Sequence, residues 1–521
     1  MTVWIEVALE SYRTHEAHRT DRSDDATPAA LAGALEQIPA FAGVAPVRSR
    51  LATRDIPLKA AGWRLSVDTL DGARTLCATH EDGPPIPGFT RYRTFARPAG
   101  EDLAASLREF AEADDASRAP LAKAHRVAAP ESDDGAPSST PDSDSGDEVE
   151  RIEWRIDAGG ADILATLETD AQGRAALRLA APAADGALDA VFRLAGEIID
   201  AAPFFIAPDE AHELANDAAN GAANDAANEP VFAAKLALPR TATRREAFIA
   251  IAASVAQQWF GNEFAARAGL SDEHVHQLRV AQRRLKTLLK LFRDDVDETW
   301  TTRIAPDLKW FGDLLADARD WDVFTDKTLP SYAASDDNAA RWQTLIDAAD
   351  LRRRVARDRV RDALASKRYV RLTLAFVERL ARFASQEDET PVRLVSYAKK
   401  RIRKDYRRIA RVADLASLEP HERHRVRIHA KRLRYALEFF RSVTTQRTRK
   451  QTAKMLGALQ TVLGEANDAA VAADRLASMP EATDYQRGFA RAWGAASARK
   501  DAQEGERLLR AMHRPRVRAS L

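Results

Sequence analysis

The spacing of hydrophobic residues divides the chain into a mixed N-terminal part and a helical C-terminal part. Within residues 1–212, alternating hydrophobic and polar positions predict β-strands, and stretches with helical spacing predict helices between them. The predicted strands are Val3–Leu9, Trp63–Val67, Thr75–Thr79, Ile152–Ile156, Ile163–Glu168 and Ala175–Leu179. The predicted helices are Ala30–Gln37, Glu101–Ala113 and Leu188–Ala201. This pattern indicates an α+β domain.

The C-terminal part has the period of an α-helix almost throughout. From Arg244 to Met512, Ala, Leu, Arg and Glu dominate, short breaks contain Pro, Gly and Asp, and no stretch predicts a strand. We therefore expect residues 231–515 to form an all-α domain, which is too long for one simple four-helix bundle.

Two segments lack the residues that build a core. Residues 131–148 are rich in Ser, Pro, Asp and Gly, which predicts a disordered insertion. Asn216–Asn228 repeats a short unit of Ala, Asn and Asp, so residues 213–230 are expected to form a flexible linker.

Composition narrows the class of protein. The 521 residues allow two to four domains at about 150 residues each. The single cysteine, Cys77, excludes an internal disulfide and a zinc site built from cysteines. The sequence contains no membrane-spanning run of about 18 apolar residues and no basic, apolar signal peptide at its start. We expect a cytoplasmic protein.

The charge is distributed unequally along the chain, although the total of 78 basic and 78 acidic residues gives a net charge of zero. Residues 1–230 hold 21 Lys and Arg against 41 Asp and Glu, a net charge of −20. Residues 231–521 hold the other 57 (78 − 21) basic and 37 (78 − 41) acidic residues, a net charge of +20. Such asymmetry is typical of a chain with a polyanion-binding region.

The helical part contains an internal repeat. VHQLRVAQRRLKTLLKLF (Val275–Phe292) aligns with RHRVRIHAKRLRYALEFF (Arg423–Phe440) at an offset of 148 residues. LLADARDWDV (Leu314–Val323) aligns with VLGEANDAAV (Val462–Val471) at the same offset, which matches Asp320 to Asp468. Two segments with one offset predict two copies of a helical unit, packed with pseudo-twofold symmetry.

Each copy carries a narrow stripe of cations on one helix, with a histidine at its N-terminal end. The leucines and phenylalanine of the first copy start two positions later and face away from the stripe. Like charges at this spacing are destabilising unless an anion neutralises them, and a linear chain of phosphates suits the spacing. The stripe residues are His276, Arg279, Arg283, Lys286 and Lys290 in the first copy, and His424, Arg427, Lys431 and Arg434 in the second.

Other helices add positive charge to the same half. Lys400, Lys404 and Arg407 lie on one face of a predicted helix, arginines line a face within 350–371, and the C-terminal tail adds Arg514, Arg516 and Arg518. The alternative interpretation is a solvated face on which each cation pairs with Asp or Glu. The two histidines are open to three interpretations, which are a structural hydrogen bond, a metal ligand or a donor to phosphate. Because neither stripe has a second ligand at metal spacing, we expect no metal.

These residues resemble the CHAD domain, the conserved histidine α-helical domain. Its His-x-x-Arg-Val-x-x-Arg-Arg-Leu pattern matches His276–Leu285, and its Lys-Arg-Leu-Arg-Tyr pattern matches Lys431–Tyr435. The resemblance covers about residues 235–512 and implies two four-helix bundles around a basic cavity that binds inorganic polyphosphate, in a protein of bacterial polyphosphate granules. It also implies that phosphate is contacted by Arg279, Arg283, Arg284, Lys286, Arg427, Lys431, Arg432 and Arg434.

Residues 1–212 resemble a degenerate CYTH domain, a β-tunnel that hydrolyses triphosphates and often precedes CHAD. Its Glu-x-Glu-x-Lys strand corresponds to Glu6–Glu10, and its Leu-Arg-x-Arg segment keeps Arg64. Four positions at which the family has metal or phosphate ligands carry other residues here. Ala8 stands for the second Glu, Glu10 for the Lys, Ala52 for an Asp and Ser66 for the second Arg. Metal-assisted phosphoryl chemistry needs its cation, so we expect a non-catalytic protein without a cofactor.

The sequence therefore predicts a polyphosphate-binding protein that associates with granules and granule proteins. A residual triphosphatase in the N-terminal domain and a non-specific nucleic-acid binder are the alternatives. Against nucleic acid, the basic helices lack exposed aromatic residues for base stacking, with Tyr397, Tyr406 and Tyr435 as the only candidates.

Overall fold

The chain folds into two compact units in a computed structural model. The first unit comprises Met1–Glu229 with Lys367–Gln386, and the second comprises Pro230–Ser366 with Glu387–Leu521. The structure describes residues 2–11, 28–56, 63–100, 105–106, 149–170, 173–207, 229–386, 391–412, 414–415 and 417–518. The expected insertion 131–148, most of the predicted helix Glu101–Ala113 and most of the expected linker 213–230 lie outside the described residues.

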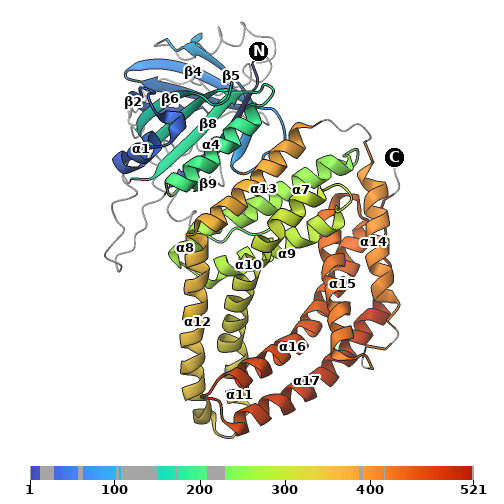
Figure 1. Ribbon diagram of the computed structural model, residues 1–521. Helices are drawn as coiled ribbons and strands as arrows, with labels where there is room; N and C mark the ends of the chain where they lie inside the picture. The colour runs from blue at the N-terminus through green and yellow to red at the C-terminus, as the bar shows by residue number, and fades with distance from the viewer. Residues whose placement is uncertain are drawn as a thin grey trace, which may run out of the picture. The chain divides into compact units, whose positions relative to one another are not determined.

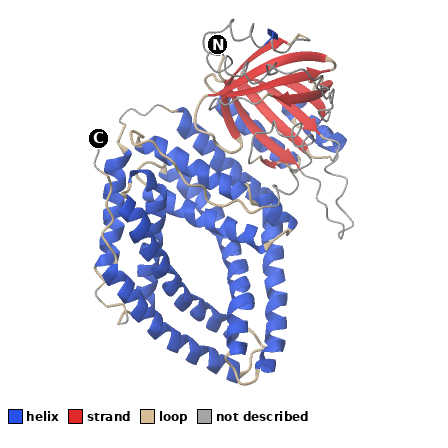
Figure 2. Ribbon diagram, turned by 180° about the vertical axis from the view of Figure 1, so that it is seen from behind, coloured by secondary structure: helices blue, strands red, loops and turns tan. Residues whose placement is uncertain are grey.

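The first unit is built on a closed antiparallel β-barrel (Figure 2, strands in red). Its strand order is β5-β4-β3-β2-β6-β7-β8-β1, and β1 also pairs with β5, which closes the barrel. A two-residue strand, β9 (Phe205–Ile206), extends the sheet beside β1. The barrel strands are β1 (Trp4–Ser11), β2 (Val47–Asp55), β3 (Trp63–Leu70), β4 (Ala73–Glu81), β5 (Phe89–Pro98), β6 (Val149–Asp157), β7 (Asp162–Thr169) and β8 (Ala175–Pro182).

The two faces of the barrel wall differ in polarity. Directly opposed residues of antiparallel strands share a face. Val7 on β1 pairs with Leu179 on β8, which pairs with Ala165 on β7, and all three are fully buried. Helix α4 (Ala187–Ala201) packs on β1 and β8, and α1 (Pro28–Glu36) packs against α4. The neighbouring residues along these strands point to the opposite face, where Arg178 on β8 pairs with Thr166 on β7. Both are buried, so polar side chains line the inside of the barrel.

The sequence pattern did not predict two of the eight barrel strands, β2 and β5. Both carry Arg or Thr at most alternate positions, and the nine residues of β2 include one buried residue, Leu51. Their strand structure depends on pairing with both neighbours in the closed barrel, which is a tertiary effect.

Helix α13 (Lys367–Ser385) belongs to the first unit, although its sequence lies between the two helical repeats. It packs on α4, where Leu374 lies next to Gly196. Arg371 pairs with Asp200 of α4 at 2.7 Å, and Arg382 pairs with Asp189. The chain therefore leaves the helical region once, contributes a helix to the barrel unit and returns.

The second unit contains two sets of four helices in the same order (Figure 1). In each set, consecutive helices pack against each other, and together they form the expected all-α region. The first set is α7 (Arg244–Phe260), α9 (Asp272–Leu291), α10 (Glu298–Val323) and α12 (Gln343–Leu364). The second set is α14 (Leu394–Ala410), α15 (Pro420–Phe439), α16 (Ala453–Ser478) and α17 (Asp484–Ala511).

The two sets pack through equivalent helices. Helix α7 contacts α14, α9 contacts α15, and α10 contacts α16. Phe292 and Phe440 directly follow α9 and α15 and are 148 residues apart in the sequence, and their ring centroids lie 6.1 Å apart. Contacts between matching positions are those of a twofold relation. No helix in the described part of the chain is long and apolar enough to cross a lipid bilayer.

Candidate anion-binding site

Helices α9 and α15 bury their aliphatic faces, and the cations of one helix interact with the cations of the other. On α9, Leu278, Leu285 and Leu288 are fully buried, and Asp272 and Glu273 occupy the first turn, where the helix dipole favours negative charge. On α15, Leu433 is buried at the position equivalent to Leu285. The stripes predicted from the sequence are therefore held on the opposite side of two well-anchored helices.

Arg279, Arg283, Arg427 and Lys431 form the centre of the site, and we call them the central cluster. Their charges interact across the contact between α9 and α15, and the three arginines together lower the pKa of Lys431. Burial is the largest cause and, with these arginines, lowers the Lys431 pKa from 10.5 to about 7. Burial also lowers the pKa of Arg279 and of Arg427, each with a further contribution from Arg283. Equivalent cations of the two repeats thus lie close enough to repel one another and to lower one another's pKa.

Gly312 of α10 allows α9 and α10 to approach closely beside the cluster. The Arg279 Nη1 group donates a hydrogen bond to the Gly312 carbonyl oxygen at 2.9 Å. A Cβ atom at position 312 would collide with the head groups of Gln282 and Lys286. Arg279 is therefore fixed by a backbone acceptor of the neighbouring helix and keeps its positive charge.

One carboxylate from each repeat faces the central cluster. Burial raises the pKa of Asp320 on α10, and the charge of Arg279 opposes this effect. Asp468 on α16 interacts with Arg427 and Lys431. The four cations are thus partly compensated by two acids. No group of three or more His, Cys, Asp or Glu residues within the described ranges is close enough to hold a metal ion.

The two stripe histidines are not equivalent in the structure. His276 is half-buried, and burial together with the charge of Arg319 lowers its pKa to about 4. It is therefore neutral at neutral pH. Its buried Nδ1 atom has no hydrogen-bond partner among the described residues. His424 is exposed on α15.

Arg284 lies apart from the central cluster, although the family motif implied a phosphate contact. Its side chain is fully buried, and its Nε group donates to Glu438 Oε1 at 2.9 Å. Its Nη1 group donates to Gln258 Oε1 at 2.7 Å, and the guanidinium lies over the Phe439 ring. A buried arginine with these partners holds helices together.

The remaining stripe residues surround the cluster. Lys286 is half-buried against α10, and burial lowers its pKa. Lys290 keeps contact with solvent at the end of the stripe, and the partial burial of its side chain, together with the charge of Arg432 on α15, lowers its pKa. Arg434 lies over the Tyr435 ring, with its Cζ atom 5.2 Å from the ring centroid.

The other basic helices divide into a free face and a paired face. Lys400, Lys404 and Arg407 are exposed on α14 and line a shallow groove with other cations of that helix. On α12, by contrast, Arg353 pairs with Asp326 at 2.7 Å and Arg357 pairs with Asp322 at 2.6 Å. The arginine face of α12 therefore fits the interpretation in which the cations pair with acids.

The sequence did not predict that the C-terminal residues form a pocket with α14. Arg514 and Arg516 line it together with Arg403 of α14 and with Arg447, which lies in the turn that leads into α16. Arg447 belongs to no stripe, so its sequence position gave no signal.

Polar groups inside the barrel neutralise one another. The Tyr92 hydroxyl donates to Glu6 Oε2 at 3.3 Å, and Arg178 forms an ion pair with Glu168. Burial raises the pKa of Glu6, and the charge of Arg178 opposes this effect. Arg178 thus supplies positive charge beside both carboxylates. The closed eight-strand barrel with a polar interior is consistent with a CYTH-like tunnel domain.

Comparisons with known proteins agree with this architecture. Residues 250–477 match the family model of the CHAD domain. Uncharacterized proteins of two strains of Mycobacterium tuberculosis are 31% and 30% identical over 212 residues, which are 39% of this chain and 39% of each relative. The chain thus aligns with about two fifths of the length of these relatives.

A solved structure extends the match over the helical unit. The crystal structure of the CHAD domain from the plant Ricinus communis aligns with a TM-score of 0.50 and 30% sequence identity. The alignment covers 56% of this chain and 99% of that domain. Together with the two matching helix sets and the family motifs, these findings show that the chain belongs to the CHAD domain family.

Proposed function

We propose that the helical unit binds inorganic polyphosphate through the central cluster of Arg279, Arg283, Arg427 and Lys431. The observation that supports this proposal is the convergence of equivalent cations from two repeats on one half-buried site. The like charges oppose one another and lower the pKa of Lys431, so the free site is electrostatically unfavourable. A bound polyanion would relieve this repulsion.

The form of the site favours a chain of phosphates over a single small anion. Cations follow each other along α9 and α15 at the spacing of helical turns, about 5 Å. Arginine binds phosphate oxygens in a bidentate manner, whereas lysine acts as a point charge. We propose that the path is extended by His276, Lys286, Lys290, His424, Arg432 and Arg434, and by Lys400, Lys404 and Arg407 on α14. Arg284 is left out because its guanidinium is buried and satisfied.

The CHAD family is associated with polyphosphate, which supports the same ligand. We further propose that the protein acts without catalysis and associates with cytoplasmic polyphosphate granules and their proteins. Co-sedimentation of the full chain with granules would test the localisation. A protein that stays in the supernatant of a granule-containing lysate would contradict it.

A direct test is calorimetric titration of the full chain with long-chain polyphosphate. Changing Arg279, Arg283, Arg427 and Lys431 together to Ala should weaken binding at least a hundredfold. The matched control changes four cations that pair with acids at exposed helix surfaces, and it should bind like the wild type. Its positions are Arg354, Arg361, Arg507 and Arg510. Undiminished affinity in the first variant would refute the proposed site.

Nucleic acid is the second candidate, because the exposed basic face of α14 would attract any polyanion. Tyr397 and Tyr435 are buried, so they are not available to stack on bases. Competition between polyphosphate and single-stranded RNA at about 0.15 M salt separates the candidates, because salt screens non-specific attraction there. Displacement of polyphosphate by RNA would favour nucleic acid.

A residual triphosphatase is the third candidate, since Glu6 remains inside a polar barrel. Phosphate release from tripolyphosphate with Mg²⁺ or Mn²⁺ tests it. We expect no phosphate release, because the positive charge of Arg178 already compensates the carboxylates of Glu6 and Glu168. Turnover that disappears in Glu6→Gln would revive the enzymatic interpretation.

A further inference from the structure

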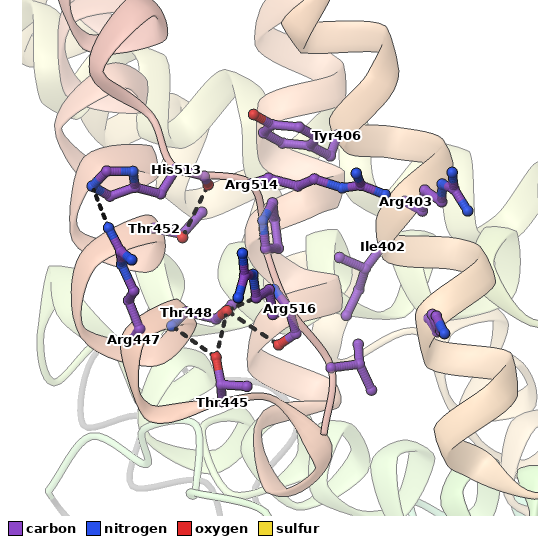
Figure 3. A pocket seen from close by; sticks show the side chains of 13 residues that line it. Ile402, Arg403, Tyr406, Thr445, Arg447, Thr448, Thr452, His513, Arg514 and Arg516 are labelled. Atoms are coloured by element: carbon purple, nitrogen blue, oxygen red, sulfur yellow. Dashed lines mark hydrogen bonds between the residues drawn. The ribbon is translucent and has the colours of Figure 1, made fainter. Parts of the chain in front are cut away.

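A pocket of about 320 Å³ lies between α14, the π-helical turn η5 (Thr448–Thr452) and the last described residues of the chain (Figure 3). No residue of α9, α10, α15 or α16 lines it, so it is separate from the central cluster. The lining residues are Lys399, Ile402, Arg403, Tyr406, Thr445, Arg447, Thr448, Thr452, His513, Arg514, Pro515, Arg516 and Val517.

The C-terminal segment is tied down through its backbone. The Thr445 N–H group donates to the Arg516 carbonyl at 3.1 Å, and the Arg518 N–H group donates to the Val443 carbonyl at 2.9 Å. The Thr448 hydroxyl accepts from the Arg516 N–H group at 2.8 Å and donates to the Arg516 carbonyl at 3.1 Å. Because these bonds use backbone atoms, the side chains of the segment stay available to the pocket.

The cations of this pocket are not neutralised. The lining contains five Lys or Arg residues and no Asp or Glu. Over the described ranges, no carboxylate forms an ion pair with Lys399, Arg403, Arg447, Arg514 or Arg516. The arginines of α12 show the opposite situation, with acids on Arg353 and Arg357. Unpaired cations gathered around one cavity repel each other unless an anion binds.

The pocket is also pre-arranged for an anion. The Arg447 Nε group donates a hydrogen bond to Gln451 Oε1 at 2.9 Å. The Arg447 Nη2 atom lies 3.2 Å from His513 Nε2. Figure 3 shows Arg514 pointing from the tail towards α14, where Arg403 and Tyr406 lie. Arg447 stands at the start of a helix, where the dipole disfavours cations, so its position carries a local cost that a bound anion would offset.

We propose that this pocket is a second anion site that binds a triphosphate group, supplied by the end of a polyphosphate chain or by a nucleoside triphosphate. A volume of about 320 Å³ holds a compact group and excludes a long folded chain. Lys399 and Arg403 line both this pocket and the groove along α14, so a longer phosphate chain can continue onto that helix. The inference does not rest on the central cluster, because the two sites share no residue.

The test uses the full chain in which Arg279, Arg283, Arg427 and Lys431 are already Ala, so that the central cluster makes no contribution. We expect this variant to retain calorimetric binding of tripolyphosphate. Adding Arg403→Ala and Arg516→Ala, both at exposed side chains, should weaken that binding at least tenfold. Adding Arg507→Ala and Arg510→Ala instead is the matched control and should leave it unchanged. Equal affinity in all three proteins, or no tripolyphosphate binding in the first, would overturn the proposal.

Titrations with tripolyphosphate, ATP and orthophosphate identify the source of the group. Binding of tripolyphosphate and ATP with similar affinity supports recognition of the triphosphate itself, and weaker binding of ATP supports a polyphosphate end. Binding of orthophosphate as tightly as tripolyphosphate would overturn the proposal, because it shows a site for any single anion. Failure of the proposed function has a different signature, in which the central variant keeps full affinity for long-chain polyphosphate.

Discussion

Lys431 should make polyphosphate binding depend on pH near neutrality. Its pKa in the free protein is about 7, because burial and the charges of Arg427, Arg283 and Arg279 disfavour the ammonium form. A bound polyanion favours that form and therefore raises the pKa. Binding is thus coupled to proton uptake above pH 7, and the affinity should fall as the pH rises through 7.

The size of the effect follows from proton linkage. Below the free-state pKa, Lys431 is charged before and after binding, so affinity is independent of its titration. Above it, each pH unit costs up to a factor of about ten when the bound-state pKa is near its ordinary value of 10.5. Between pH 6 and pH 8 the loss should be roughly tenfold, or about 1.4 kcal/mol. His276 carries no positive charge in the free protein over this range, because its pKa is about 4.

The assay is calorimetric titration of the full chain with long-chain polyphosphate at pH 6, 7 and 8. Lys431→Arg is the matched variant, because arginine keeps its charge across this range and removes the titration. Long chains have few titratable end groups, and any titration of the ligand affects both proteins equally. The same loss of affinity in wild type and Lys431→Arg would refute the assigned role of Lys431.

Three further predictions concern stability and folding. Gly312→Ala should destabilise the protein by about 1–3 kcal/mol in thermal denaturation, because the added Cβ collides with side chains of α9. Gly457→Ala on the open surface of α16 is the control and should not destabilise it. Equal melting temperatures of the two variants would contradict this prediction. Arg284→Met should lower the melting temperature, because the partner Glu438 loses its buried cation, and should leave polyphosphate affinity unchanged; weaker binding by a folded variant would return Arg284 to the site. A fragment of residues 231–521 should give less soluble protein and bind more of a hydrophobic dye than the full chain, because α13 loses its contacts with α4 and β9; a soluble, cooperatively folding fragment would show that these contacts are dispensable.

The sequence determined the features that are written locally or repeated along the chain. Helical period identified the all-α region, and a constant offset of 148 residues identified two helical units. Helical arithmetic also placed Arg279 and Arg283 on one face, whereas the expectation from the family motif that Arg284 contacts phosphate did not foresee that its side chain is buried against Glu438. These signals depend on short-range geometry, which every segment carries by itself.

The tertiary structure decided which groups meet across long separations. It placed Arg279 and Arg283 beside Arg427 and Lys431, and it supplied Asp320 and Asp468 as partial counter-charges. It also placed α13 on the barrel unit and gave β2 and β5 their partners. It brought residues 513–517 beside α14, where together they line a pocket. Each of these outcomes depends on how separate elements pack. The period of one helix or strand specifies which face is buried, but it does not specify what that face will contact.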